Sequence, residues 1–168
     1  MKMTEADVQR AIAKTPEFQK RYDILVPNCY TMYDNEADLF GLRPSGLCDE
    51  IEIKVSRADF KVDAKKSVRV SIKLDKPINY RTHKFVRFTK REALEMGHMS
   101  NYFWYAVPDQ LIKPDEVPEW AGLIYIHSDG YARVVKSAKR LHKHPLHPAE
   151  CYKTARKMNY KYWNKVLA

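Results

Sequence analysis

The chain has 168 residues, of which 45% are hydrophobic and 12% aromatic, and it carries a formal net charge of +9. This length suits one domain with a hydrophobic core and is short for two, and no stretch reaches the ~18 uninterrupted apolar residues of a membrane span. We therefore expect one cytoplasmic domain over residues 1–168, with no targeting segment and no membrane association. Three widely spaced cysteines favour free thiols over a disulfide framework.

Helices and strands are predicted along the whole chain. Thr4 is the expected N-cap of a first helix that buries Val8 and Ile12, and Thr15-Pro16 starts a second short turn. Strands are expected at 22–33, 36–42, 47–55, 101–107, 121–127 and 131–137, and helices at 56–68, at 90–98 and near the C-terminus at about 148–165. The pattern of residues 69–89 is mixed and predicts no single element.

Smaller signals define the ends of these elements. Ser56 and Asp59 resemble a capping box, and Phe60, Ala64 and Val68 follow at helical spacing. Gly97 is expected to end the helix at 90–98, and "SDG" to turn the hairpin between the last two strands. Aromatic residues are interpreted as core rather than as platforms for nucleobases: Tyr102, Phe103, Trp104, Tyr105 and Trp163.

The strand at 47–55 alternates apolar and charged residues. Ile51, Ile53 and Val55 share the face that points to the core, while Glu50, Glu52 and Lys54 share the other. If Pro44, Ser45 and Gly46 form a three-residue loop with Gly46 in the left-handed conformation, Arg43 pairs with Leu47. Asp38 then lies opposite Glu52, and Glu36 lies opposite Lys54.

Two carboxylates directly across a ladder repel one another unless a cation offsets their charge. Asp38 and Glu52 are hard oxygen donors of the kind that Mg²⁺ or Mn²⁺ binds, and Lys54 on the same face is placed to orient a water or to stabilise developing negative charge. The residues thus suggest a metal-dependent phosphodiesterase centre. The alternative is an ordinary half-exposed strand, in which Glu50 and Lys54 form ion pairs on a solvated face.

The stretch "EADLFGLRPSGLCDEIEIKVSRADFKVDAKK" resembles the core of the PD-(D/E)xK nuclease superfamily, in the branch of MmcB-related DNA-repair proteins and small phage proteins. The downstream "NYFWYAVP" and "EWAGLIYIHSDGYARVV" are also similar to that branch. The matching residues are Asp38, Glu52, Ile53, Lys54, Ser56, Asp59, Phe60, Asp63 and Lys65.

This resemblance implies a restriction-endonuclease-like α/β domain with a mixed central sheet flanked by helices. It implies that Asp38 and Glu52 hold a catalytic Mg²⁺ and that Lys54 is the catalytic lysine. The chain departs from the family motif in having Ala37, not proline, before Asp38. Asp49 is a rival for the first acid by position, but its place on the Ile51 face ranks it lower.

Other residues near this motif keep more than one interpretation. Glu36 shares a face with Asp38, so it is an auxiliary catalytic or ligand residue, a group that binds a second water, or a partner of Lys54. Ser56 and Asp59 fit helix capping. Lys65 and Lys66 either reach nucleic-acid phosphate or lie on a solvated surface.

The positive charge is concentrated at the C-terminal end. Ten of the 30 basic residues but one of the 21 acidic residues lie in 131–168, so the first 130 residues hold 20 of each. The last helix repeats a lysine every four residues, which is mildly destabilising without a polyanion along it. We expect these residues to contact nucleic-acid phosphates without reading sequence: Lys153, Arg156, Lys157, Lys161 and Lys165. A solvated helix face is the alternative.

A second cluster contains His142, His144, His147 and Cys151, which are zinc-ligand residue types. Their spacing matches no standard zinc finger, and the sequence favours a basic loop near the nucleic acid.

The sequence therefore predicts a Mg²⁺- or Mn²⁺-dependent deoxyribonuclease of bacterial or phage origin, acting in DNA repair, recombination or phage DNA processing, with DNA as partner. The alternatives are a non-cleaving DNA-binding module on the same fold and an RNA nuclease. The sequence leaves open whether the protein forms a homodimer or binds another protein.

Overall fold

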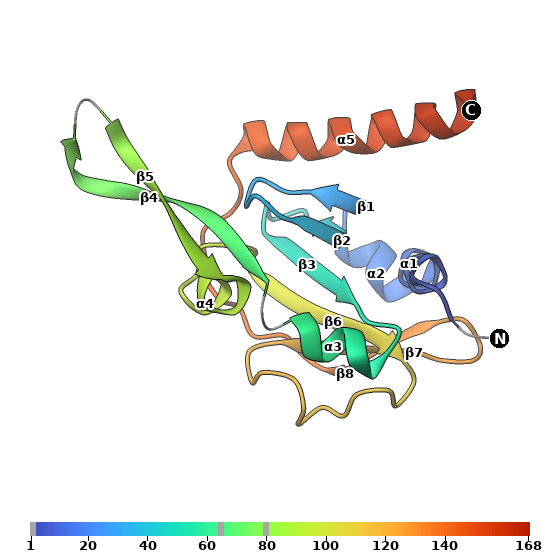
Figure 1. The fold of residues 1–168 in the computed structure, drawn as a ribbon. Helices are drawn as coiled ribbons and strands as arrows, with labels where there is room; N and C mark the ends of the chain where they lie inside the picture. Colours follow the sequence, from blue (N-terminus) through green and yellow to red (C-terminus); the bar gives the residue numbers. More distant parts are fainter. Residues whose placement is uncertain (1–2, 64–65, 79–80) are drawn as a thin grey trace.

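A six-stranded sheet forms the centre of the protein, with strand order β1-β2-β3-β6-β7-β8 (Figure 1). The pairs β3–β6 and β6–β7 are parallel and the other three are antiparallel. The computed structural model describes residues 3–63, 66–78 and 81–168. Its elements are α1 (Glu5–Lys14), α2 (Pro16–Arg21), β1 (Ile24–Tyr30), β2 (Glu36–Leu42), β3 (Cys48–Ile53), α3 (Arg57–Asp63), β4 (Ser67–Ile78), β5 (Arg81–Thr89), α4 (Lys90–Glu95), β6 (Tyr102–Pro108), β7 (Gly122–Ile126), β8 (Ala132–Lys136) and α5 (Pro148–Leu167). The predicted mixed sheet flanked by helices is confirmed.

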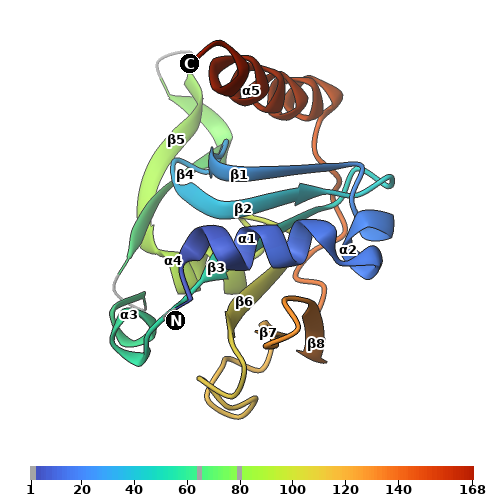
Figure 2. The same ribbon diagram turned by 90° about the vertical axis from the view of Figure 1, so that its right-hand side faces the viewer.

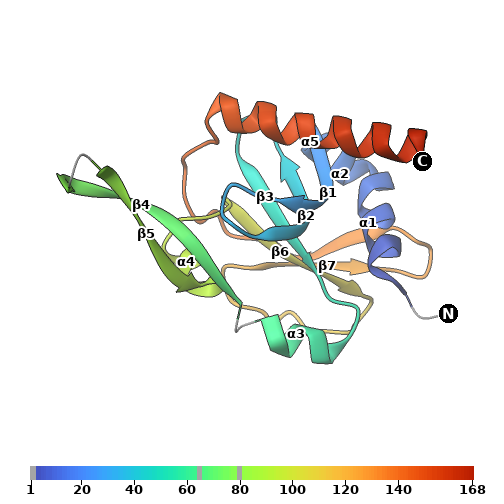
Figure 3. The ribbon, with the colours of Figure 1, turned by 45° about the horizontal axis from the view of Figure 1, so that its top comes forward.

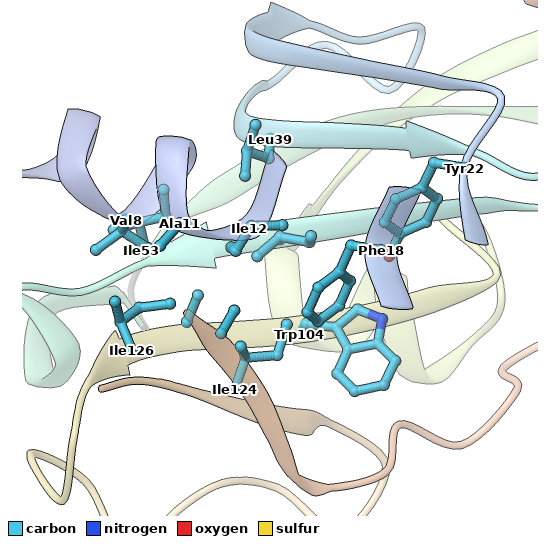
Figure 4. Packing of buried hydrophobic residues seen from close by; sticks show 13 residues of the cluster. Val8, Ala11, Ile12, Phe18, Tyr22, Leu39, Ile53, Trp104, Ile124 and Ile126 are labelled. Carbon is cyan, nitrogen blue, oxygen red and sulfur yellow. The ribbon is translucent and has the colours of Figure 1, made fainter. Parts of the chain in front are cut away.

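Helices α1 and α2 cover one face of this sheet (Figure 2). Thr4 begins α1 with a capping box to Asp7, as predicted, which satisfies amide groups that the first turn leaves unpaired. Figure 4 shows Ile12 and Phe18 packed among side chains of the central strands, including Trp104. Alternate residues of β3, among them Ile53, point into this core, so the charged residues between them point to the opposite face.

The opposite face packs against α4 and the bases of β4 and β5. Val68 and Val70 of β4 and Leu94 of α4 lie in one buried cluster with Phe103 of β6. Strand β6 is buried along both faces, as its run of aromatic residues predicted. The charged face of β3 is therefore covered by protein on this side, not by solvent.

Helix α5 lies beside the edge strand β1 and is visible along its whole length in Figure 3. Thr154 is its one buried residue, and most of its other side chains are exposed. Trp163 is 49% exposed, so the prediction that it belongs to the core is wrong. No helix in the described part of the chain is long and apolar enough to cross a membrane.

The region after β3 differs most from the predictions. The helix expected at 56–68 is confirmed at its start, where Ser56 bonds Asp59, but α3 ends at Asp63. Val68 lies in β4 and is buried there, because Val68, Val70 and Ile72 alternate with polar residues in a strand period. Of the unassigned residues 69–89, those that the structure describes, 69–78 and 81–89, lie in the antiparallel β4–β5 ribbon, which extends away from the central sheet (Figure 1).

Candidate functional site

The β2–β3 hairpin has the register that the sequence predicts. The Arg43 amide donates to the Leu47 carbonyl at 2.9 Å, and Gly46 has a φ of 78°, the left-handed conformation that favours glycine. The ladder continues to the pair Leu39 and Ile51. The next position along the two strands brings Asp38 beside Glu52.

Asp38 lies where the β2–β3 ladder ends. Its Oδ2 accepts a hydrogen bond of 2.6 Å from the Ile53 amide, which a continued ladder would have given to a β2 carbonyl. The side chain of Gln9 in α1 donates to the Asp38 carbonyl at 3.0 Å. Asp38 is thus held from both sides, with its carboxylate next to the end of β3.

Glu52 is buried at the centre of a group of lysines. Its Oε1 lies 2.7 Å from the Nζ of Lys54 and also pairs with Lys66, and its Oε2 lies 2.7 Å from the Nζ of Lys90. Glu50 and Glu52 are 0% and 1% exposed, and Lys54 is 6% exposed. The alternative of a half-exposed strand with ion pairs on a solvated face is therefore wrong.

Glu50 and Lys90 complete this buried group. The sequence placed Glu50 on the same strand face as Glu52 and Lys54 but gave it no role in the centre, and it did not identify Lys90. Lys90 Nζ lies 2.8 Å from Glu50 Oε1, to which Asn35 Nδ2 also donates at 2.8 Å. Glu50 Oε2 has no hydrogen-bond partner within the described ranges. A signal for Lys90 was present, since it shares a helical face with the buried residues Ala93 and Leu94.

The pKa values of Asp38 and Glu52 are shifted in opposite directions. Burial, together with the charge of Glu52, raises the pKa of Asp38 from 3.8 to about 6. Burial also acts to raise the pKa of Glu52, but the Lys90 and Lys54 ammonium groups outweigh it and hold that pKa well below its usual range. The pKa of Lys90 is raised because Glu50 and Glu52 outweigh its own burial.

When all groups are ionised, this centre balances three carboxylates against three ammonium groups: Asp38, Glu50 and Glu52 against Lys54, Lys66 and Lys90. Among residues 3–63, 66–78 and 81–168, no three side chains of His, Cys, Asp or Glu converge as a metal-binding group would. Asp38 and Glu52 instead offer two carboxylates, which is the number that Mg²⁺ commonly uses when water or substrate oxygens supply its other ligands.

Other predicted site residues lie in several places. Glu36 is exposed at the start of β2 and pairs across the ladder with Tyr30 of β1. Asp49 is buried on the α1–α2 face, where Arg43, Tyr22 and Trp104 bind its carboxylate, so it is not part of the centre. Lys65 lies outside the described residues.

A hollow of about 310 Å³ lies next to the centre on the α4 side. Lys90 forms part of its wall, together with aromatic residues of β6 and α3 such as Tyr105 and Phe60. Asp38 and Glu52 do not line it. A ligand in this hollow would therefore meet Lys90 before it met the carboxylates.

The predicted lysine row of α5 drifts around the helix by about 120° between Lys153 and Lys165. Four residues exceed one helical turn by about 40°, so the row winds around the axis. Lys153 is exposed and pairs with Glu150, whereas Lys157 is half-buried and donates to the Tyr30 carbonyl. Lys165 lines a groove facing α1 and α2.

The outward side of α5 carries different side chains: Tyr152, Arg156, Tyr160 and Trp163, all exposed. The phosphate contacts predicted for α5 stay predictions.

The histidines of the loop before α5 have structural partners. His142 Nε2 lies 2.7 Å from the Met99 carbonyl, and its ring stacks on His144. The buried Asn101 donates to the carbonyls of both histidines. His147 caps α5 by accepting from the Ala149 amide.

No protein-family profile matches this chain, and no curated protein matches it. Its fold is similar to the solved structure of a protein of unknown function from Silicibacter pomeroyi, with a TM-score of 0.61 and 20% sequence identity. The similarity covers 99% of this chain and 91% of that chain, and at this identity it shows a common fold alone. The chain is thus a mixed α/β protein with a buried carboxylate–lysine centre.

Proposed function

We propose that this protein is a metal-dependent nuclease of the PD-(D/E)xK type, with a restriction-endonuclease-like domain and DNA as substrate. The observation that carries the proposal is the position of Glu52, buried and bonded to Lys54 two residues later, with Asp38 beside it across the hairpin. Residues of these types at this spacing suit phosphodiester hydrolysis. The sequence resemblance supports the same conclusion.

Asp38 and Glu52 would hold Mg²⁺ or Mn²⁺, which supplies Lewis-acid stabilisation and lowers the pKa of a bound water. Glu52 is oriented for this role by Lys90, which fixes one of its oxygens, and by Lys54, which bonds the other. Lys66 also bonds Glu52, but its side chain is half exposed and can move to a substrate phosphate. Lys54 assists the attacking water.

The test is cleavage of labelled single-stranded, double-stranded and branched DNA with Mg²⁺ or Mn²⁺. We expect metal-dependent products from the wild type and a loss of at least about 100-fold in Glu52→Gln and Lys54→Met, since the first removes a carboxylate ligand of the metal and the second removes the ammonium group that assists the attacking water. Glu17→Gln, on the exposed surface of α2, is the matched control and should cut like the wild type. Equal rates in all variants would reject the centre.

The basic helix α5 supports DNA as the partner. We expect Lys157→Glu combined with Lys161→Glu to weaken DNA binding and to lower the salt dependence of log K by about two. Lys14→Glu with Lys20→Glu, on α1 and α2, makes the same change of charge elsewhere. Binding titrations over a salt series measure the effect, and an affinity equal to that of the Lys14 and Lys20 control would contradict a role for α5.

A second function, a DNA-binding module that does not cut, is favoured by one observation. Lys54, Lys66 and Lys90 already neutralise Glu52, so the buried centre is balanced by the chain's own charges. Calorimetric titration with Mn²⁺ separates the two functions. Binding that disappears in Glu52→Gln supports the nuclease, and its absence in the wild type supports the module. An RNA nuclease is distinguished by adding RNA to the cleavage panel.

A further inference from the structure

The β4–β5 ribbon has a basic face that the functional centre does not use. Residues 67–89 contain six Lys or Arg residues and one acid, Asp75. The register places Arg69 directly opposite Arg87, and Lys73 opposite His83. All four side chains are exposed on the same side of the ribbon, because paired residues at alternate positions share a face.

Like charges directly across a ladder are unfavourable, so this pairing lowers the stability of the isolated ribbon. Within the described residues, Arg69, Lys73 and Arg87 have no carboxylate partner. Arg69 instead lies over the ring of Phe85, itself 62% exposed, at 4.1 Å from its centroid. The face is thus positively charged, exposed and uncompensated, which fits a polyanionic partner.

The part of the basic face near the central sheet borders a depression. Arg69, Ser71 and Phe85 form one wall of a depression of about 310 Å³, and the β1–β2 connection around Tyr30 forms the other. Asp34 also lines this depression and accepts a hydrogen bond from the Tyr30 hydroxyl. The Tyr30 carbonyl binds Lys157 of α5, so the depression lies between two basic elements.

Both ends of the ribbon are attached to the carboxylate centre. Lys66 immediately precedes β4, Lys90 immediately follows β5, and both ammonium groups bind Glu52. The Lys90 amide donates to the Lys66 carbonyl at 2.8 Å, which closes the base of the ribbon. The base of the ribbon is therefore tied to Glu52 through these two lysines.

We propose that the β4–β5 ribbon is an arm whose basic face binds double-stranded DNA, with Arg69 and Arg87 as its central contacts. A two-stranded ribbon fits the major groove of B-DNA, which is about 12 Å wide. At ~3.3 Å per residue, the 12 residues of β4 extend to about 40 Å, enough to follow the duplex beyond the protein body. That the arm presents this duplex for cleavage rests on the proposed nuclease function, whereas its binding of DNA does not.

The test is equilibrium binding of a fluorescent duplex of mixed sequence to the full chain in EDTA, where no metal-dependent cutting occurs. Arg69→Ser combined with Arg87→Ser should weaken binding roughly 10–100-fold at about 0.1 M salt and lower the slope of log K against log salt by about two. The control, Lys20→Ser combined with Lys84→Ser, removes the same charge from α2 and from the other face of the ribbon. It should bind like the wild type.

Thermal unfolding is the accompanying readout. Because the double arginine variant removes a like-charged pair, its melting temperature should equal or exceed that of the wild type. Equal losses of affinity in the arginine variant and the control would overturn the proposal, as would a loss confined to single-stranded DNA of the same sequence. If the arginine variant loses binding while the wild type cuts no substrate, the arm is supported and the nuclease function is rejected.

Discussion

Lys90→Met is expected to lower the free energy of unfolding by about 3–5 kcal/mol at pH 7. Lys90 is 4% exposed, and its ammonium group lies 2.8 Å from Glu50 and 2.7 Å from Glu52. The variant leaves Glu50 with the Asn35 amide as its remaining partner in the described chain. A buried carboxylate without a cation is the costly state, so the loss arises from the charges left behind.

Denaturant unfolding of Lys90→Met and Arg91→Met separates this cause from general damage to α4. Arg91 is exposed and pairs with Glu95 one helical turn later, so Arg91→Met should cost at most about 0.5 kcal/mol. Adding Glu50→Gln to Lys90→Met should recover part of the loss, since one buried charge is removed. Similar losses in both single variants, or no recovery in the double variant, would contradict the account.

The loss in Lys90→Met should also depend on pH. Without Lys90 the folded-state pKa of Glu52 rises, because the Lys90 charge is the largest of those that hold it down, and a raised carboxylate pKa lowers stability as pH rises through it. The deficit of Lys90→Met relative to wild type should therefore be smaller at pH 5 than at pH 7. A deficit that does not change with pH would indicate a packing defect instead.

Asp38→Asn is expected to stabilise the protein at pH 8. The folded-state pKa of Asp38 is about 6, above its ordinary value of 3.8, which corresponds to at most about 3 kcal/mol of lost stability once the group is ionised. Because Asp38 is partly exposed, we expect about 1–2 kcal/mol. Asparagine keeps an oxygen that can accept from the Ile53 amide.

The dependence of stability on pH that Asp38 causes is opposite to that of a carboxylate in a buried ion pair. The penalty is absent below about pH 4, where Asp38 is protonated in both states, and it develops as pH rises from about 4 to 6. The advantage of Asp38→Asn in thermal or denaturant unfolding should follow the same course. Asp49→Asn is the matched control and should destabilise, because Arg43, Tyr22 and Trp104 all bind that carboxylate. A stabilised Asp49→Asn or a destabilised Asp38→Asn would contradict the assignment.

Divalent cation gives an independent check on Asp38. If Asp38 and Glu52 bind Mn²⁺, saturating Mn²⁺ should raise the melting temperature of the wild type by mass action. Asp38→Asn should gain less, so its advantage should shrink as Mn²⁺ is added. This readout does not depend on cleavage.

Local patterns predicted the hairpin and its register. The "RPSG" turn sets which residues pair, and alternation in β3 then separates the core face from the charged face. The same short-range logic predicted the caps at Thr4 and Ser56 and the turn at Gly130, each confirmed in the structure. These features depend on residues within a few positions of one another.

The sequence by itself therefore determined that Asp38, Glu52 and Lys54 would share one site. Only the tertiary structure decided that this site is buried. It also decided that Lys90 and Lys66, which follow Glu52 by 38 and 14 residues, complete the site. No local pattern reports such a meeting, because Lys90 and Lys66 reach Glu52 through the path of the β4–β5 ribbon and the packing of α4. Burial is the main cause of the raised pKa of Asp38. Burial is also the reason that Glu50 and Glu52 need the Lys90 charge, since carboxylates in water are stable without a partner.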